Sequence, residues 1–295
     1  MSNSAPKVYL DYTQEALDRA YDQRNWASNA DEIIRAYGED SAAIRAKHPH
    51  RYAVPYGPSD DETLDIFAPA TPAPGGKAKI HVHVHGGSWR NLSKDDESII
   101  APTFTSHGAI CVILNFSMIP KVRIPQMVAQ LRGAIRWVHK HAAEFGGDPD
   151  QIHLSGHSSG GHLAGVLMTR DWTEDGLPAD VLKSGLLISG MFDLRPVMLS
   201  ARSSYVTLSD AEVRDMSAIL HIDRLRAPIV LSWGGLESPE FQRHPQAFAA
   251  AVKAAGKPVS TLACEGLNHF EILQQLADPK TPLSRAALGL MGLGG

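Results

Sequence analysis

The sequence predicts an α/β fold, with a mostly parallel central sheet covered by helices on both faces. Two observations lead to this prediction. Apolar, strand-like runs alternate with amphipathic helical segments from residue 78 to residue 278. Several of the strand-like runs are almost uninterrupted in apolar residues, as in "AICVILNF", which is typical of parallel strands buried on both faces. The chain has 295 residues and is 43% hydrophobic, so we expect a single domain spanning 1–295.

The expected elements follow the chain in order. Helical periodicity covers residues 11–47, and residues 48–69 read as two short strands around a turn at Gly57-Pro58. A loop over 71–77 leads into the alternating region. We expect strands at 78–85, 109–116, 151–158, 181–190, 227–235 and 259–266. We expect helices at 98–108, 126–147, 159–172, 238–256 and 269–278. Residues 195–226 should form mixed, partly helical structure. Sites in such sheets lie beyond the carboxyl ends of the strands, so the loops after strands are where chemistry is expected.

The clearest motif is "GHSSG", which matches G-x-S-x-G with Ser158 at its centre. A strand precedes it and a helix follows, as a sharp nucleophile-bearing turn requires. Side chains at Gly156 or Gly160 would collide with neighbouring elements in such a turn. The spacing excludes Ser159 as the nucleophile, because the residue two positions before it is not glycine. Ser158 is therefore the predicted nucleophile.

A serine hydroxyl needs a base, and the base needs an orienting acid. In α/β-hydrolases these follow in the order Ser, Asp or Glu, His. The predicted base is His269, which comes after the last strand, and its rivals are His221 and His244. The predicted acid is Glu237, in the loop after the strand at 227–235. Glu240 and Asp193 remain as alternatives for the acid.

The stretch "HVHVHGGSW" supplies a glycine loop after an earlier strand. Such loops donate backbone N–H groups to the oxyanion of an acyl-transfer transition state, together with the residue after the nucleophile. The predicted oxyanion hole therefore consists of Gly86, Gly87 and Ser159. Glycine allows close approach of the backbone to the substrate because it has no Cβ.

The three histidines of the same stretch raise the question of a metal site. His81, His83 and His85 share one side of a strand, but the outer two lie about 13 Å apart along it. They cannot all bind one ion, so we expect no metal. His85 is expected to brace the glycine loop through hydrogen bonds, and the other two to be satisfied interior histidines.

Together these motifs resemble the α/β-hydrolase superfamily, in the branch of kynurenine formamidase-like esterases near the hormone-sensitive-lipase group. The matching segments are "HGGSWRNLSKDD", "GGDPDQIHLSGHSSGGHLA", "ISGMFDLRP", "ESPEFQRHPQAF" and "NHFEIL". That branch places its acid immediately before Ser-Pro-Glu-Phe, which supports Glu237, although Asp is more usual there than Glu. The segment around "LDRAYDQRNW" is also similar, which implies an N-terminal helical cap over residues 1–50. A second cap element is expected in 195–226.

The resemblance implies a serine carboxylesterase that cleaves small carboxylic esters through an acyl-enzyme. An arylformamidase acting on an N-formylkynurenine-type amide is the alternative, and a non-catalytic ligand-binding homologue is a remote one. The resemblance implies no cofactor. Trp89, beside the glycine loop, is the expected pocket residue, with plain packing as its alternative reading.

Composition narrows the expected partners and compartment. The net charge is −4 and no run of five Lys or Arg residues occurs, so we expect no nucleic acid partner. No long apolar stretch or signal-like N-terminus is present, so we expect no membrane contact. The two cysteines, Cys111 and Cys264, read as reduced interior thiols of a cytoplasmic protein. The expected partner is a small ester or amide substrate, and the sequence leaves the oligomeric state open.

Overall fold

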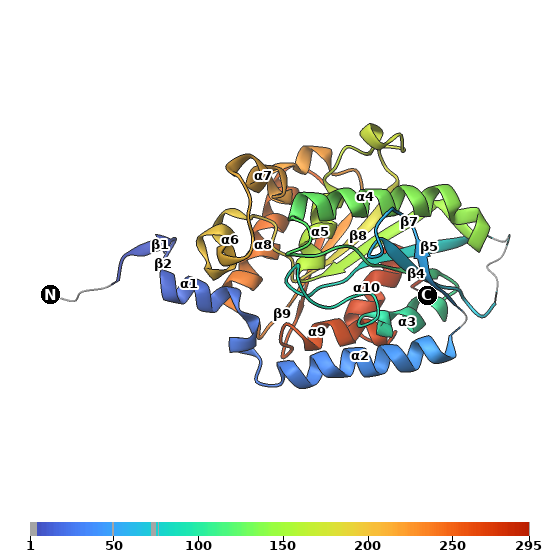
Figure 1. Ribbon diagram of the computed structural model, residues 1–295, viewed down its shortest axis with the longest axis horizontal. Coiled ribbons are helices and arrows are strands. Elements are labelled where there is room, and N and C mark those ends of the chain that lie inside the picture. Colours follow the sequence, from blue (N-terminus) through green and yellow to red (C-terminus); the bar gives the residue numbers. More distant parts are fainter. Residues whose placement is uncertain (1–4, 49, 72–74, 76, 295) are drawn as a thin grey trace.

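A computed structural model describes residues 5–48, 50–71, 75 and 77–294. Its centre is an eight-stranded sheet with the strand order β10-β9-β8-β7-β5-β6-β4-β3 (Figure 1). The strands from β5 to β10 pair in parallel, and β4 runs antiparallel to both β6 and β3. The strands are β3 His50–Pro55, β4 Thr63–Phe67, β5 Ala78–Val84, β6 Ile110–Leu114, β7 Gly147–His157, β8 Leu182–Ile188, β9 Ile229–Gly234 and β10 Val259–Cys264. The predicted α/β fold with a mostly parallel sheet is confirmed.

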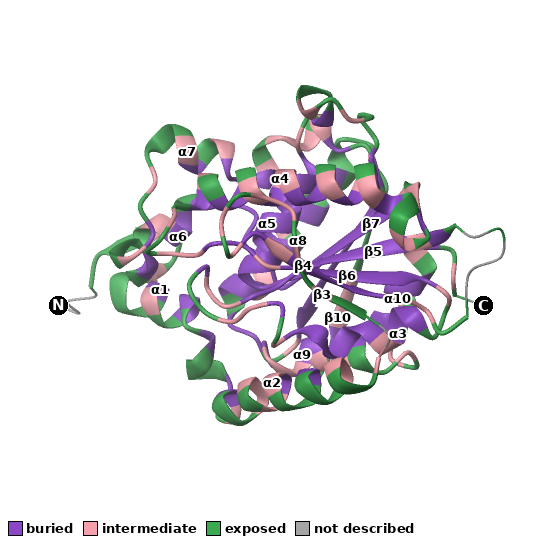
Figure 2. Ribbon diagram, turned by 45° about the vertical axis from the view of Figure 1, so that its right-hand side comes forward, coloured by how far each residue is buried: buried purple, intermediate pink, exposed green. Residues whose placement is uncertain are grey.

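Helices cover both faces of this sheet, and Figure 2 shows its central strands as almost wholly buried. One apolar cluster joins the sheet to α4, α5 and α8, and a second joins it to α2, α3, α9 and α10. The longer helices are α1 Gln14–Tyr21, α2 Ala30–Lys47, α4 Ile124–His141, α5 Ser159–Met168, α8 Pro239–Ala254 and α10 Pro282–Leu290, and the shorter ones are α3 Ala101–Thr105, α6 Arg195–Leu199, α7 Asp210–Asp215 and α9 Glu271–Gln274. Of the described helices, none combines the length and the apolar character needed to cross a bilayer.

The predicted helix at 159–172 ends at Met168, the one at 98–108 is a 3₁₀ turn, Ser98–Ile100, followed by the short α3, and the other differences lie at the chain ends. A small hairpin, β1 Lys7–Tyr9 with β2 Tyr12–Thr13, precedes the two predicted N-terminal helices. The predicted helix at 269–278 is shorter, because α9 gives way to a 3₁₀ turn, Gln275–Ala277, and the unpredicted helix α10 follows. Residues 72–74 and 76 of the predicted loop at 71–77 lie outside the described residues.

Candidate active site

Ser158 lies at the sharp turn between β7 and α5, at the carboxyl edge of the sheet. Its backbone angles are φ 57° and ψ −121°, a conformation that residues other than glycine rarely adopt. A Cβ on Gly156 would lie 2.3 Å from the Gly160 carbonyl oxygen, and one on Gly160 would lie 2.1 Å from that of Val84. The predicted reason for glycine on both sides of the serine is thus confirmed.

His269 meets Ser158 from the loop between β10 and α9. Its Nε2 lies 2.8 Å from Ser158 Oγ, and both residues are about 95% buried, with 4% and 5% exposure. The backbone around the imidazole is held from two sides. His157 Nε2 lies 2.9 Å from the His269 carbonyl oxygen, and Asn268 Oδ1 accepts the N–H of Phe270 at 2.9 Å. The arrangement gives the serine a base within hydrogen-bond reach.

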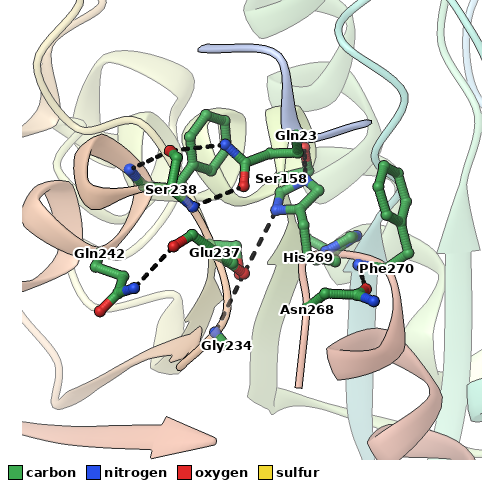
Figure 3. A network of polar contacts seen from close by, with 12 residues as sticks. Gln23, Ser158, Gly234, Glu237, Ser238, Gln242, Asn268, His269 and Phe270 are labelled. Atoms are coloured by element: carbon green, nitrogen blue, oxygen red, sulfur yellow. Dashed lines mark hydrogen bonds and ion pairs between the residues drawn. The ribbon is translucent and has the colours of Figure 1, made fainter. Parts of the chain in front are cut away.

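Glu237 approaches the other side of the same imidazole (Figure 3). Its Oε1 lies 3.4 Å from His269 Nδ1 and accepts hydrogen bonds from the Ser189 hydroxyl at 2.5 Å and the Gly234 N–H at 3.1 Å. These two donors fix the carboxylate behind the histidine, although Nδ1 itself makes no hydrogen bond. Glu237 is therefore placed where an orienting acid would be, with room for a small adjustment.

The rival residues lie elsewhere in the structure. Glu240 is paired with Arg243 at 2.8 Å, and Asp193 is paired with Arg195 at 2.6 Å. The remaining rivals, His244 and His221, contact the Tyr21 hydroxyl and the Arg214 carbonyl oxygen, respectively. None of these contacts involves Ser158, so the structure brings together Ser158, His269 and Glu237 and leaves the alternatives apart.

The glycine loop requires one correction, at Gly86. Its N–H donates to Glu97 Oε1 at 2.8 Å, and the residue is buried, so Gly86 does not offer a donor to the cavity as predicted. Gly87 is partly exposed and lines the cavity, and its N–H has no acceptor among the described residues. Ser159 is the first residue of α5, so its N–H has no acceptor within the helix. Gly87 and Ser159 remain as the candidate oxyanion donors.

Trp89 requires a second correction. It is 1% exposed, is absent from the cavity wall, and its indole N–H donates to His162 Nδ1 at 3.2 Å. Ser88 and Trp89 both have positive φ, 56° and 61°, and this unusual backbone turns the indole into the core instead of the pocket. The alternative reading of Trp89 as a packing residue therefore holds.

The three histidines are all buried, and each has a partner within the protein. His85 Nδ1 lies 2.8 Å from the Gly86 carbonyl oxygen and its ring stacks on Phe116, which agrees with the predicted brace. His81 and His83 both contact the hydroxyl of Ser155. Across the described ranges, no cluster of three His, Cys, Asp or Glu residues has the arrangement of a metal site.

The cavity above Ser158 has a volume of about 660 Å³. Besides the glycine loop, its wall comes from residues 18–24 and 201–205, the N-terminal segment and the mixed region. Arg202 joins these two segments, because its guanidinium donates to the Tyr21 carbonyl oxygen at 2.7 Å. Tyr21 and Arg202 lie in the two expected cap elements, but the sequence did not single out either residue or predict the contact between them.

Comparisons with known proteins identify relatives of this chain. The BD-FAE family model matches residues 64–181. Kynurenine formamidase of Danio rerio is 28% identical over 292 residues, which cover 95% of this chain and 97% of the relative. Esterase LipQ of Mycobacterium tuberculosis is 37% identical over 126 residues, 40% of this chain and 30% of that protein.

Two solved structures share the fold. A candidate thioesterase from Silicibacter sp. superposes with a TM-score of 0.81 at 24% identity, covering 92% of this chain and 98% of the other. An esterase from Pyrobaculum calidifontis superposes with a TM-score of 0.70 at 16% identity, covering 90% and 93%. The fold and the relatives define the chain as a hydrolase of the α/β-hydrolase superfamily. Its relatives by sequence include kynurenine formamidases and esterases.

Proposed function

We propose that this hydrolase cleaves small carboxylic esters through an acyl-enzyme on Ser158. The observation that carries the proposal is the 2.8 Å contact between Ser158 Oγ and His269 Nε2 at the wall of the cavity, with Glu237 behind the imidazole. This is the arrangement that activates a serine hydroxyl for attack on an acyl group.

In the proposed reaction, Ser158 Oγ attacks the ester carbonyl carbon while His269 Nε2 takes the hydroxyl proton. The carbonyl oxygen becomes an oxyanion and receives the N–H groups of Gly87 and Ser159. When the carbon–oxygen bond to the alcohol breaks, His269 returns the proton to the leaving oxygen. Water then attacks the acyl-enzyme by the same route and releases the acid. Glu237 keeps the imidazole oriented and stabilises its cationic form. Every group in this scheme is a protein group, so we propose that no cofactor takes part.

Arylformamide hydrolysis is the second candidate, and one observation favours it. The match to the kynurenine formamidase of Danio rerio spans 95% of this chain, whereas esterase LipQ matches 40%. The longer match includes residues 18–24, which line the cavity. The chemistry would be the same, with the N-formyl carbon in place of the ester carbon. A non-catalytic role is disfavoured, because a nucleophile already hydrogen-bonded to its base serves no purpose in a binding protein.

The test is a substrate panel with an active-site variant. Purified protein is assayed with p-nitrophenyl acetate, longer p-nitrophenyl esters and N-formylkynurenine, and kcat/KM is compared. We expect the highest values for short esters. A kcat/KM for N-formylkynurenine at least 100-fold above every ester would establish the second candidate instead. Ser158→Ala should abolish both activities with an unchanged circular dichroism spectrum, and an active Ser158→Ala protein would refute the mechanism.

We further propose a cytoplasmic location and a small-molecule ester or amide as the only partner the site requires. The two cysteines support the location, since Cys111 and Cys264 are buried and unpaired, as thiols are in a reducing compartment. The net charge of −4 disfavours nucleic acid as a partner.

A further inference from the structure

A buried carboxylate lies directly beneath the glycine loop. Glu97 is 0% exposed, and it immediately precedes a 3₁₀ turn, Ser98–Ile100. One oxygen, Oε1, accepts the Gly86 N–H at 2.8 Å, and the other, Oε2, lies 2.7 Å from His83 Nε2. A sealed carboxylate costs several kcal/mol unless its oxygens are paired. Such a group needs an explanation, and the reaction scheme above does not use it.

The hydrogen bonds continue from Glu97 across two strands. His83 Nδ1 lies 2.6 Å from Ser155 Oγ, and the same hydroxyl lies 2.8 Å from His81 Nε2. Ser155 is on β7, three residues before Ser158, while both histidines are on β5. The polar row therefore ties the strand that carries the nucleophile to the strand that leads into the glycine loop.

The unpartnered atom at the end of the row fixes the direction of its hydrogen bonds. His81 Nδ1 has no hydrogen-bond partner within the part of the chain that the structure describes, and an unpaired buried N–H costs more than an unpaired lone pair. The proton of His81 therefore sits on Nε2 and is donated to Ser155 Oγ. Ser155 then donates its own proton to His83 Nδ1, and His83 donates from Nε2 to Glu97. Every donor points toward Glu97, which is the arrangement that an ionised carboxylate requires.

The ionisation of Glu97 agrees with this direction. Burial raises the pKa of the Glu97 carboxyl, but the hydrogen bond with His83 and the neighbouring histidines lower it by more, so the net shift is downward. A charged acceptor makes a stronger hydrogen bond to a backbone N–H than a neutral one does. The hydrogen bond from the Gly86 N–H to the Glu97 carboxylate is therefore stronger than a hydrogen bond between two neutral groups.

Glu97 accepts the N–H of Gly86, which is the residue immediately before Gly87, the proposed oxyanion donor. Gly87 has φ +105°, which glycine adopts readily, but Ser88 and Trp89 follow it with φ 56° and 61°, a conformation that is unfavourable for residues other than glycine. A Cβ on Gly87 would lie 1.7 Å from the Asn91 carbonyl oxygen, so the loop is packed closely. The hydrogen bond to Glu97 directs the Gly86 N–H away from the cavity. The next residue, Gly87, lines the cavity.

We propose that Glu97 is a positioning residue that holds the Gly87 N–H in place for the oxyanion, with His83 and Ser155 holding Glu97 in turn. The "HVHVH" histidines thereby gain a role in catalysis without a metal. The inference rests on the proposed function, because it assigns a support to that reaction's oxyanion hole.

The test separates transition-state stabilisation from folding. An aryl trifluoromethyl ketone accepts Ser158 Oγ at its carbonyl carbon, the Ser158 proton moves to His269, and the former carbonyl oxygen becomes an oxyanion in the hole. Its inhibition constant therefore reports on the Gly87 donor. Active sites are counted by titration with a p-nitrophenyl organophosphate, so that kcat refers only to folded, reactive protein.

For Glu97→Ala we expect kcat per titrated site to fall about 100-fold, the size of losing one oxyanion donor, with KM changed less than about threefold. The inhibition constant of the ketone should rise by the same factor as kcat/KM falls. Glu97→Gln should recover activity to within about tenfold of the unmodified protein, since its amide oxygen can still accept the Gly86 N–H. The neighbouring Asp96→Asn, whose Oδ2 accepts only the Ser93 hydroxyl, is the matched control and should behave as the unmodified protein.

If Glu97→Ala does not fold, Ser155→Ala and Glu97→Gln decide the matter. Ser155→Ala removes the hydroxyl between the two histidines and should lower kcat and ketone affinity in parallel. Unchanged kcat per site in the folded variants, or a loss of kcat without loss of ketone affinity, would overturn the inference. If the organophosphate fails to label Ser158 in the unmodified protein, the proposed function itself fails, and the two failures are thus distinguishable.

Discussion

Glu237 Oε1 lies 3.4 Å from His269 Nδ1, and the same oxygen accepts hydrogen bonds from Ser189 and Gly234. The carboxylate is held by its own loop and by the strand beside it, so its position does not depend on the histidine. A small closure of this distance would complete the hydrogen bond when the imidazole becomes cationic, since hydrogen bonds of a catalytic site commonly tighten only with substrate bound.

Replacing Glu237 by Gln should therefore remove most of the activity. An amide cannot stabilise the imidazolium and favours the wrong tautomer, and we expect kcat to fall about 10⁴-fold, as for an acid-to-amide change in a comparable triad. Glu240→Gln, which removes a carboxylate paired with Arg243, should leave kcat within about tenfold while lowering the melting temperature. Steady-state kinetics on both variants checks this, and the opposite order of effects would assign the acid to Glu240.

Replacing Gly87 by Ala should abolish activity and destabilise the protein. Its φ of +105° is unfavourable for alanine, and the added Cβ would meet the Asn91 carbonyl oxygen at 1.7 Å, so the loop must move. We expect a stability loss of about 2 kcal/mol or more, measured by urea unfolding. Gly108→Ala is a useful comparison, since Gly108 has φ +78° and open space around it. Equal kinetic effects at the two positions would argue against a role for the glycine loop.

Stability should fall as the pH is lowered below about 6.5. Burial lowers the pKa of His157 and His244 to about 3 and of His153 and His162 to about 4, so all four are neutral in the folded protein at neutral pH. The unfolded chain binds these protons near pH 6.5, so it holds more protons than the folded chain between pH 6.5 and 4. The free energy of unfolding then decreases by up to about 1.4 kcal/mol per pH unit for each histidine.

Urea unfolding at pH 7, 6 and 5 measures this slope. His153→Gln offers a control, because His153 contacts Ser184 on β8 and takes no part in the proposed reaction. This variant should show a shallower dependence on pH than the unmodified protein. A free energy of unfolding that does not change between pH 7 and pH 5 would contradict the prediction.

Esterase activity should survive removal of divalent metals. The three histidines of "HVHVH" contact Ser155, Glu97 and the Gly86 carbonyl oxygen, and among the described residues no cluster of three His, Cys, Asp or Glu could hold an ion. Overnight dialysis against EDTA, followed by assay with p-nitrophenyl acetate, should leave kcat unchanged. Activity that is lost on dialysis and restored by Zn²⁺ would return the histidines to consideration as ligands.

The sequence predicted the sheet and the meeting of Ser158, Glu237 and His269, because these depend on signals that the chain carries locally. Apolar runs mark the strands, and the ends of parallel strands lie at one edge whatever the details of the loops. The order of the three residues along the chain then selects one loop each. Glu240 lies in the first turn of α8 and is paired with Arg243, so it stays apart from these three residues.

Trp89, Gly86 and Glu97 could not be predicted in the same way. The indole of Trp89 points into the core, and Ser88 and Trp89 both have positive φ. The residue types serine and tryptophan do not predict that backbone conformation. The N–H of Gly86 donates to Glu97, eleven residues further along the chain, at the other end of the loop between β5 and the 3₁₀ turn. A contact across such a loop depends on its three-dimensional path, which sequence spacing does not encode.

The hydrogen bond from Arg202 to the Tyr21 carbonyl oxygen has a consequence for how the substrate preference of this protein could change in evolution. Part of the cavity wall comes from residues 18–24 and 201–205, whereas Ser158, Glu237 and His269 follow strands of the sheet. Selection for a new substrate can therefore act on two short surface stretches while the reacting atoms keep their places. Because Arg202 binds the backbone carbonyl oxygen of Tyr21, this contact does not use the Tyr21 side chain, whose hydroxyl lies 2.7 Å from His244 Nε2.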